Sequence, residues 1–395
     1  MGRKGRNGSS FFTSLTASFI AAIKKEGGVV KKLFVFLITV VLIGCNDQHI
    51  VEDVGFVQAL GMDKTEKEDK FLVSAIVPQI EPDAENEREF LTTVSDSDKE
   101  ATLSLSRQSN REIENGQLRN VLFGKEAAMK GIAEQIKTMN RDPIFGTRVK
   151  VSVVNGQAYE LLSKPYTQHP QVSVYLDALL EKESKLQMTA ETRLHQITRD
   201  LFEEGIDPIA PVIKIGGDKI VLDGIALFDD DKYVDKINPV DARIFFFLHG
   251  SFSAGAVHLK LDEKVNGGKV QLLFDSIRNK RNVKVKKAAS PENIKIDVEI
   301  NIKGALLEYN GPLDITKNQD LRTLEKQLGK SVEKRAEDII QKLQAKQVDS
   351  LGIGKKVRNS LSYDQWNRLD WQEIYPNIDI VPHVKAEIND IGVYS

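Results

Sequence analysis

The chain has 395 residues but a single cysteine, Cys45, and this residue restricts the possible folds more than any other feature. One thiol cannot form an intramolecular disulfide, which excludes the small disulfide-stapled folds. It also excludes any zinc site that needs two or more thiolates. The chain must therefore be held together by apolar cores. Its hydrophobic content of 41% and charged content of 28% are typical of a globular protein, and its length predicts two or three domains.

Cys45 directly follows a short apolar segment that has basic residues in front of it. Lys31 and Lys32 precede twelve uncharged, mostly apolar residues at 33–44. This order of a basic and an apolar region is typical of a secretory signal peptide. The run is shorter than the roughly 20 apolar residues that span a membrane. We therefore predict that residues 1–44 are a signal peptide whose basic and apolar regions lie at 31–44.

The end of this segment resembles a bacterial lipobox, with Leu42, Ile43 and Gly44 directly before Cys45. In that class of protein, diacylglycerol is attached to the cysteine thiol and the chain is cleaved before the cysteine. The resemblance implies a lipidated N-terminus at Cys45, and two or more acyl chains would anchor it firmly. The alternative is a buried cysteine in a membrane anchor or a core helix.

Residues 1–28 do not fit a signal peptide. They contain a second apolar stretch at 11–23 and the sequence Lys-Glu-Gly-Gly at 25–28. A purine-rich string that resembles a bacterial ribosome-binding site can encode those four residues. We therefore expect translation to begin at Val29 or Val30, with a genuine extended basic region as the alternative.

Removal of residues 1–44 changes the charge of the chain. The whole sequence has 55 basic and 57 acidic residues, and residues 1–44 contain seven Lys or Arg and one Glu. The predicted mature part, 45–395, therefore has 48 basic and 56 acidic residues, a net charge of −8. Anionic headgroups repel such a body, so we expect it to stand off the membrane surface. Neither charge balance is typical of a nucleic-acid-binding protein.

Residues 46–205 mix strand-like and helix-like patterns. The segments 54–62 and 71–77 predict a strand hairpin with a charged turn. From 97 to 163 the patterns read helix, strand, helix, strand, helix, which predicts a parallel or mixed sheet flanked by helices. We expect 46–205 to form an N-terminal α+β region, with a division into two subdomains as the alternative.

A pair of closely spaced prolines ends the helical pattern, so residues 206–217 are expected to link two domains. The second domain, 218–395, has an alternating apolar strand at 294–307 and a helical pattern at 320–347. That helix would be roughly 40 Å long. The prediction is an α+β, multi-domain fold with mixed or antiparallel sheets packed with helices and a long amphipathic helix near the C-terminus.

The sequence has one candidate contact surface, the basic run at 278–287. Within it, Lys284, Lys286 and Lys287 are the residues we predict to contact headgroups or an acidic partner. The alternative is the exposed face of a strand pair, because valines alternate with these lysines.

Motifs for catalysis or metal binding are absent from the sequence. It has no His-Glu-x-x-His motif, no phosphate-binding loop, no dinucleotide-binding glycine motif and no G-x-S-x-G elbow. The closest histidines, His249 and His258, are nine residues apart, which is wide for metal ligands. The aspartates at 229–231 lack the rest of a calcium loop and predict a hairpin turn. We expect no enzymatic activity, no metal and no cofactor other than covalent diacylglycerol on Cys45.

Short motifs follow the lipobox in a fixed order. They are Gly-Met-Asp-Lys at 61–64, Arg-x-x-Asn-Arg at 107–111, Val-Leu-Phe-Gly-Lys-Glu at 121–126, Arg-Asp-Pro at 141–143, Gly-Ile-Ala-Leu-Phe at 224–228, Leu-Gly-Ile-Gly at 351–354, Trp366, and Trp371 with Tyr-Pro at 375–376. This order, over residues 42–395, resembles the Ger(x)C family, the C subunits of GerA-type nutrient germinant receptors of endospore-forming bacteria. The sequence departs from that family in residues 1–28 and in Asn46, where many relatives have tryptophan.

The resemblance implies a non-enzymatic lipoprotein on the outer face of the spore inner membrane. It would act with two integral-membrane partners, the A and B subunits, in a complex that responds to amino acids, sugars or nucleosides. That response starts ion and dipicolinate release and so triggers germination. The family fold is implied to be α+β with about three subdomains. Direct contact of this subunit with the nutrient stays open.

Two other functions are compatible with a lipid anchor. The first is a solute-binding protein of a transporter, although the alternating strands at 269–307 fit its repeated parallel units poorly. The second is a hydrolase, against which the missing motifs argue. Stabilisation of the soluble part by a nutrient would favour the solute-binding protein. Co-purification with membrane partners would favour the receptor subunit.

Overall fold

The computed structural model describes residues 53–67, 70–79, 88–253, 255–265, 268–286 and 294–391. Contacts between residues divide the chain into two compact units, which meet in the sequence between Val54 and Gly55. The described residues form an eight-stranded sheet, a five-stranded sheet, and a small ribbon of β1 (Val54–Phe56) and β5 (Glu112–Glu114). In these ranges, no helix combines the length and the apolar character needed to cross a membrane.

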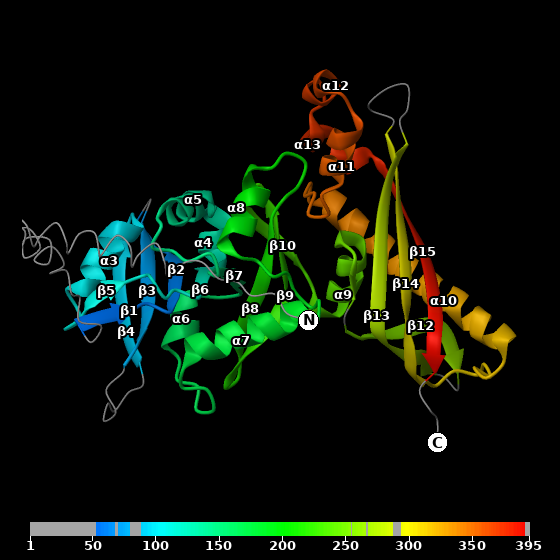
Figure 1. The fold of residues 1–395 in the computed structure, drawn as a ribbon, viewed down its shortest axis with the longest axis horizontal. Coiled ribbons are helices and arrows are strands. Elements are labelled where there is room, and N and C mark those ends of the chain that lie inside the picture. The colour runs from blue at the N-terminus through cyan, green and yellow to red at the C-terminus, as the bar shows by residue number, and fades with distance from the viewer. Residues whose placement is uncertain are drawn as a thin grey trace, which may run out of the picture. The chain divides into compact units, whose positions relative to one another are not determined.

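The eight-stranded sheet has the order β10-β9-β8-β7-β6-β2-β3-β4 (Figure 1). Its strands are β2 (Ala59–Lys64), β3 (Phe71–Pro78), β4 (Arg88–Ser95), β6 (Asn120–Gly124), β7 (Lys150–Val154), β8 (Ile209–Gly216), β9 (Lys219–Asp229) and β10 (Lys232–Ile237). The central strands β2, β6, β7 and β8 run parallel, and antiparallel strands complete both ends. The predicted hairpin and the predicted mixed sheet are both confirmed.

Helices cover both faces of this sheet (Figure 1). One face carries α3 (Asp98–Ser106), α4 (Lys125–Lys130), α5 (Ala133–Arg141) and α8 (Leu194–Phe202), and the other carries α6 (Ala158–Ser163) and α7 (Val172–Lys185). Neighbouring residues of β6 therefore enter two different cores. Leu122 packs under α6 and α7, and Phe123 packs on the opposite face, and both are fully buried. Burial on both faces explains the consecutive apolar residues at 121–123 in β6 and at 153–154 in β7.

The expected linker at 206–217 contains β8, and β9 and β10 after it complete the same sheet. Pro211 is the third residue of β8 and pairs with Ile225 of β9, whereas β8 begins to pair with β7 only at Val212. The missing N–H of the proline therefore removes no bond from the β7–β8 ladder. The first sheet therefore continues through the segment that the prolines marked. The division of the chain into two domains at this point stays a prediction.

The five-stranded sheet consists of β11 (Phe252–Ser253), β12 (Val257–Val265), β13 (Gly268–Lys286), β14 (Lys295–Tyr309) and β15 (Asp379–Ile391). β13 is antiparallel to β11, β12 and β14, whereas β14 and β15 run parallel. β14 alternates as the pattern at 294–307 predicts. Its buried side chains include Ile296, Val298, Ile300 and Ile302, and the polar residues between them face the solvent.

The predicted long helix is α10 (Asn318–Ala345), which packs on the buried face of this sheet (Figure 1). Two of its carboxylates also bind the edge strand β15. Glu333 accepts a hydrogen bond from Val384 N at 2.9 Å, and Glu325 accepts one from Ile388 N at 2.8 Å. These bonds satisfy N–H groups that an edge strand would otherwise offer to another chain. The predicted α+β fold, with mixed sheets packed with helices, is confirmed.

Four helices and a helical turn complete the second core: α9 (Pro239–His249), α11 (Ile353–Ser360), α12 (Tyr363–Asn367), α13 (Trp371–Ile374) and the 3₁₀ turn Tyr375–Asn377. α9 contributes the fully buried Phe245 and Phe247. The helices after α10 contribute Trp366 and Tyr375, which are also buried. They pack on the same apolar cluster as β13 and β14.

Candidate functional site

The predicted lipidation site precedes the described part of the chain. Cys45 and the lipobox residues Leu42, Ile43 and Gly44 all come before residue 53, where the described structure begins. Lipidation of Cys45 therefore stays a prediction.

Two of the three lysines predicted as a contact patch form ion pairs across the β13–β14 hairpin. Lys284 pairs with Glu299, and Lys286 pairs with Asp297. The hydrogen bond from each lysine lowers the pKa of the carboxyl that it contacts. More than half of each lysine side chain is exposed, so the patch stays a prediction although its charge is largely balanced. Lys287 lies outside the described residues.

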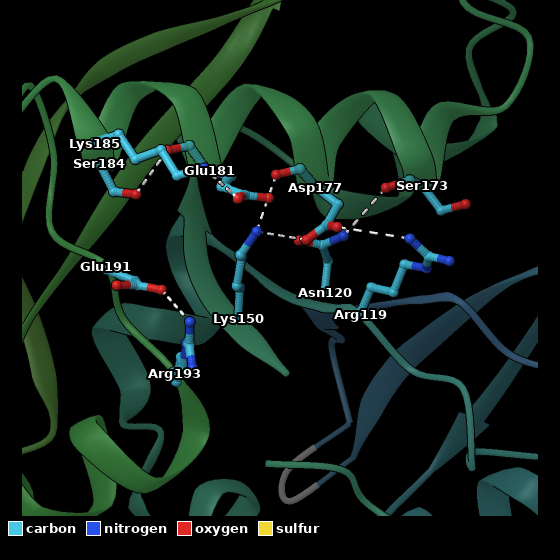
Figure 2. A network of polar contacts seen from close by, with 10 residues as sticks. All are labelled: Arg119, Asn120, Lys150, Ser173, Asp177, Glu181, Ser184, Lys185, Glu191 and Arg193. Carbon is cyan, nitrogen blue, oxygen red and sulfur yellow. Dashed lines mark hydrogen bonds and ion pairs between the residues drawn. The ribbon is translucent and has the colours of Figure 1, made fainter. Parts of the chain in front are cut away.

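Figure 2 shows a polar network that joins α7 to β6 and β7. The Lys150 ammonium donates to Asp177 Oδ1 at 2.5 Å and to the Asp177 carbonyl oxygen at 3.0 Å. Arg119 lies 3.6 Å from the other carboxylate oxygen of Asp177. Asn120 Nδ2 donates to the carbonyl oxygen of Ser173 at 3.3 Å. Lys150 is buried, and pairing is what makes burial of its charge tolerable. The network therefore holds α7 on the sheet, and we assign it no ligand.

A second cluster of contacts lies where residues 203–208 meet residues 347–375, and we call these two segments the junction. The Gly205 carbonyl accepts a hydrogen bond from Lys355 N at 2.9 Å. The Asp207 carboxylate accepts one from Asp349 N at 2.5 Å, and Asp207 N donates to the Asp349 carbonyl at 3.1 Å. The start of β8 is thus bound through its backbone to the segment that leads into α11.

Two glycines allow the backbones to meet in the junction. Gly205 has a φ of +79°, and a Cβ atom there would lie 2.5 Å from the carbonyl carbon of Gly354. A Cβ atom on Gly354 would lie 2.6 Å from Gly205 Cα and 2.6 Å from Trp371 Nε1. Either side chain would push the two segments apart, and position 205 also has the left-handed backbone that favours glycine.

Side chains reinforce this backbone contact. Glu203 pairs with Lys355 at 2.6 Å and with Arg358 at 3.0 Å, and the hydrogen bond from Lys355 lowers the pKa of Glu203. The neighbouring Glu204 accepts a hydrogen bond from Trp366 Nε1 at 2.6 Å. Glu203 and Glu204 therefore hold the first segment of the junction against α11 and α12.

A pocket of about 690 Å³ opens at the junction, a volume typical of small-molecule sites. Its lining combines carboxylates with aromatic rings. The carboxylates are Asp200, Glu203, Glu204, Asp207, Asp230, Asp349 and Asp370, and the aromatic residues are Phe202, Trp366, Trp371 and Tyr375.

Asp349 is a lining residue of this pocket and is buried. Its carboxylate accepts hydrogen bonds from Ile353 N at 2.9 Å, Gly354 N at 2.6 Å and Trp371 Nε1 at 3.1 Å. It therefore satisfies free N–H groups at the start of α11. Burial raises the pKa of Asp349 to about 7 in spite of these donors, and burial raises the pKa of Asp207 to about 6.

The aromatic residues of the pocket pack in series. The ring centroids of Trp366 and Trp371 are 5.9 Å apart, and those of Trp371 and Tyr375 are 5.6 Å apart. Tyr375 is 1% exposed, and its hydroxyl has no hydrogen-bond partner among the described residues. Burial raises the pKa of this hydroxyl well above its usual value, so it is a neutral donor. Buried tyrosine hydroxyls usually have a partner, which makes this one exceptional.

The sequence alone does not reveal this pocket. In the sequence, both tryptophans and Tyr375 stand out only as members of motifs in a family-like order. The available signal was the density of carboxylates just before the prolines, at 200–207. Nothing in the sequence pairs that segment with residues some 150 positions later, since the pairing depends on how α10 returns the chain.

Comparison with known proteins assigns both halves of the chain. Residues 47–215 match the model of the spore germination protein N-terminal domain. Residues 223–392 match the model of the "Spore germination B3/GerAC like" C-terminal domain. The chain belongs to the Ger(x)C family of spore germination proteins.

Relatives and a solved structure agree with this family. The chain is 28% identical to spore germination protein GerQC of Bacillus cereus over 92% of its length and 99% of that protein. It is 21% identical to spore germination protein KC of Bacillus subtilis over 90% of its length and 93% of that protein. The crystal structure of the GerBC protein matches with a TM-score of 0.55 at 15% identity, over 84% of this chain and 96% of that one, which shows a shared fold.

Proposed function

We propose that this Ger(x)C protein is a non-enzymatic, lipid-anchored subunit of a nutrient germinant receptor that triggers endospore germination. The observation that carries the proposal is the match of both family domains over nearly all of residues 47–392. The first matched residue comes two positions after Cys45, so a lipid on Cys45 would be attached next to the first family domain.

The proposed location is the outer face of the spore inner membrane, where the chain acts with the integral-membrane A and B subunits. The net charge of −8 on residues 45–395 supports attachment through lipid rather than through headgroup contacts. The lipid supplies membrane affinity that this charge does not. In this proposal, the assembled receptor and not this subunit alone recognises the germinant and starts ion release.

Replacement of the lipidated cysteine tests the anchor. Spores are labelled with an alkyne analogue of palmitate. The label incorporated into this protein is compared between wild type, Cys45→Ala and the control Asn46→Ser, which keeps the thiol and the lipobox. We expect label in wild type and in Asn46→Ser but none in Cys45→Ala. We also expect Cys45→Ala spores to lose most of their germination response. Equal label in Cys45→Ala, or a full response without label, would refute the anchor.

A further inference from the structure

The pocket at the junction has an excess of negative charge. Seven carboxylates line it against a single lining arginine, Arg368. Among the described residues, only two of the seven have a lysine or arginine within ion-pair distance: Asp200 pairs with Arg199, and Glu203 pairs with Lys355 and Arg358. The carboxylates without such a cation are Glu204, Asp207, Asp230, Asp349 and Asp370.

Arg281, which does not line the pocket, does not cancel this charge by direct pairing. Arg281 interacts electrostatically with Asp349, but its guanidinium donates to the carbonyl oxygens of His249 and Leu351. Two of these carboxylates, Glu204 and Asp230, belong to exposed residues, and each also accepts a hydrogen bond from a helix after α10: Glu204 from Trp366 Nε1 at 2.6 Å and Asp230 from Gln372 Nε2 at 3.5 Å. A soluble cation can therefore reach them.

The aromatic side of the pocket supplies an independent indication of a ligand. Trp366, Trp371 and Tyr375 form a continuous series of rings in which Trp371 is partly exposed and the other two are buried, and an exposed ring face attracts organic cations. The Tyr375 hydroxyl adds a buried polar group that no described residue satisfies. Aromatic rings beside carboxylates are the usual combination for recognising ammonium groups.

The arrangement favours an organic cation over a bare metal ion. Within the described ranges, no three carboxylate, histidine or cysteine side chains converge closely enough to hold a metal. The volume of about 690 Å³ also exceeds what a hydrated ion fills and suits a molecule of several carbon atoms.

We propose that the junction pocket binds a small organic cation, with its ammonium group against the partly exposed ring of Trp371, beside the Tyr375 hydroxyl and within reach of Glu204 and Asp230. The proposed binding requires neither the lipid anchor nor a receptor partner to supply a residue, since every lining residue belongs to this chain. The site does depend on the junction, because its two walls come from segments that the Gly205–Gly354 contact holds together.

Intrinsic fluorescence provides a direct assay, because the only two tryptophans of the chain, Trp366 and Trp371, both line the pocket. The mature lipoprotein in detergent is titrated with choline and with cadaverine at constant ionic strength. Their neutral isosteres, 3,3-dimethylbutan-1-ol and 1,5-pentanediol, serve as matched controls. We expect a saturable change in tryptophan emission with at least one of the two cations and none with its isostere.

Substitutions locate the binding. Tyr375→Phe, Glu204→Gln and Asp230→Asn each remove one polar group while keeping size, and Asn tolerates the positive φ of residue 230. We expect each to weaken cation binding about tenfold. Asp364→Asn, an exposed carboxylate on α12 outside the pocket, should change nothing. Equal responses to cation and isostere, no saturable response to either cation, or equal affinity in all four variants would overturn the proposal.

Discussion

The two large sheets of this protein solve the problem of burying β-strands in opposite ways. In the eight-stranded sheet, helices lie on both faces, and β6 and β7 have no exposed residue. In the five-stranded sheet, α10 covers one face, and the other face of β13 and β14 carries ion pairs. The first kind of sheet needs an apolar residue at nearly every position, and the second needs one at every other position.

This difference determines how much the sequence could reveal. The strict alternation at 294–307 identified β14 and its buried face, and the helical period identified α10, because each pattern reports a single covered face. The short apolar runs of β6 and β7 indicated buried strands and helices in alternation. Their order along the chain could be predicted, but not the pairing of β8 into the same sheet, because prolines marked that segment as a linker.

The candidate site was beyond the sequence for a different reason. Gly205 and Gly354 meet through their backbones, and a glycine carries no side-chain pattern that could pair it with a distant partner. The carboxylates of the pocket are indistinguishable from ordinary charged surface until the fold brings the tryptophans beside them. By contrast, the lipobox around Cys45 is a contiguous motif, and it could be predicted although it lies outside the described residues.

Truncation of neighbouring residues gives the largest expected effect. In β6, both Leu122→Ala and Phe123→Ala should destabilise the protein, by about 2–5 and about 3–5 kcal/mol, because each leaves a cavity in a different core. In β14, Ile300→Ala should cost about 2–5 kcal/mol, whereas Asn301→Ala should stay within about 0.5 kcal/mol. Urea unfolding measures all four. Equal effects of the two β14 variants would break the comparison.

The junction between the start of β8 and the helices after α10 gives the next largest effect. Gly205→Ala combines the penalty of a left-handed backbone with overlap against Gly354, and we expect a loss of roughly 2–5 kcal/mol. Gly217→Ala is the matched control, because Gly217 has a similar φ of +64° but open space around it. It should cost only about 1–2 kcal/mol. A thermal melt in which the two variants lose the same stability would show that the backbone contact is unimportant.

The pH dependence of stability tests the buried carboxyl of the junction. The pKa of Asp349 is about 7 in the folded protein and near 3.9 in an unfolded chain, so the folded state binds this proton more tightly. Its stabilising contribution is therefore complete below about pH 4 and is lost as the pH rises through 7. The variant Asp349→Asn removes only this carboxyl group and leaves the neighbouring titratable residues Asp207, Tyr375 and Arg281 in place. The free energy of unfolding of wild type, minus that of Asp349→Asn, should fall between pH 4.5 and 8. A difference that rises with pH would contradict the assignment.

The ion pairs on the open face of the five-stranded sheet give the smallest effect. Lys284 and Glu299 lie on neighbouring strands and are partly exposed, so a double-mutant cycle with alanine should yield a coupling of about 0.2–1 kcal/mol. The coupling should shrink in 1 M salt, where exposed charges are screened. The less exposed pair between Lys150 of β7 and Asp177 of α7 should show a larger and less salt-sensitive coupling. A larger coupling energy for Lys284–Glu299 than for Lys150–Asp177 would contradict the difference proposed between the two sheets.

Affinity purification of the tagged chain from detergent-solubilised spores, with mass spectrometry of what accompanies it, tests most directly whether it is a receptor subunit. We predict that two integral-membrane proteins, the A and B subunits of one germinant receptor, are recovered in near-equal amounts with it. Recovery of a transporter permease in their place, or of no membrane protein under conditions that preserve other receptor complexes, would contradict the proposed function.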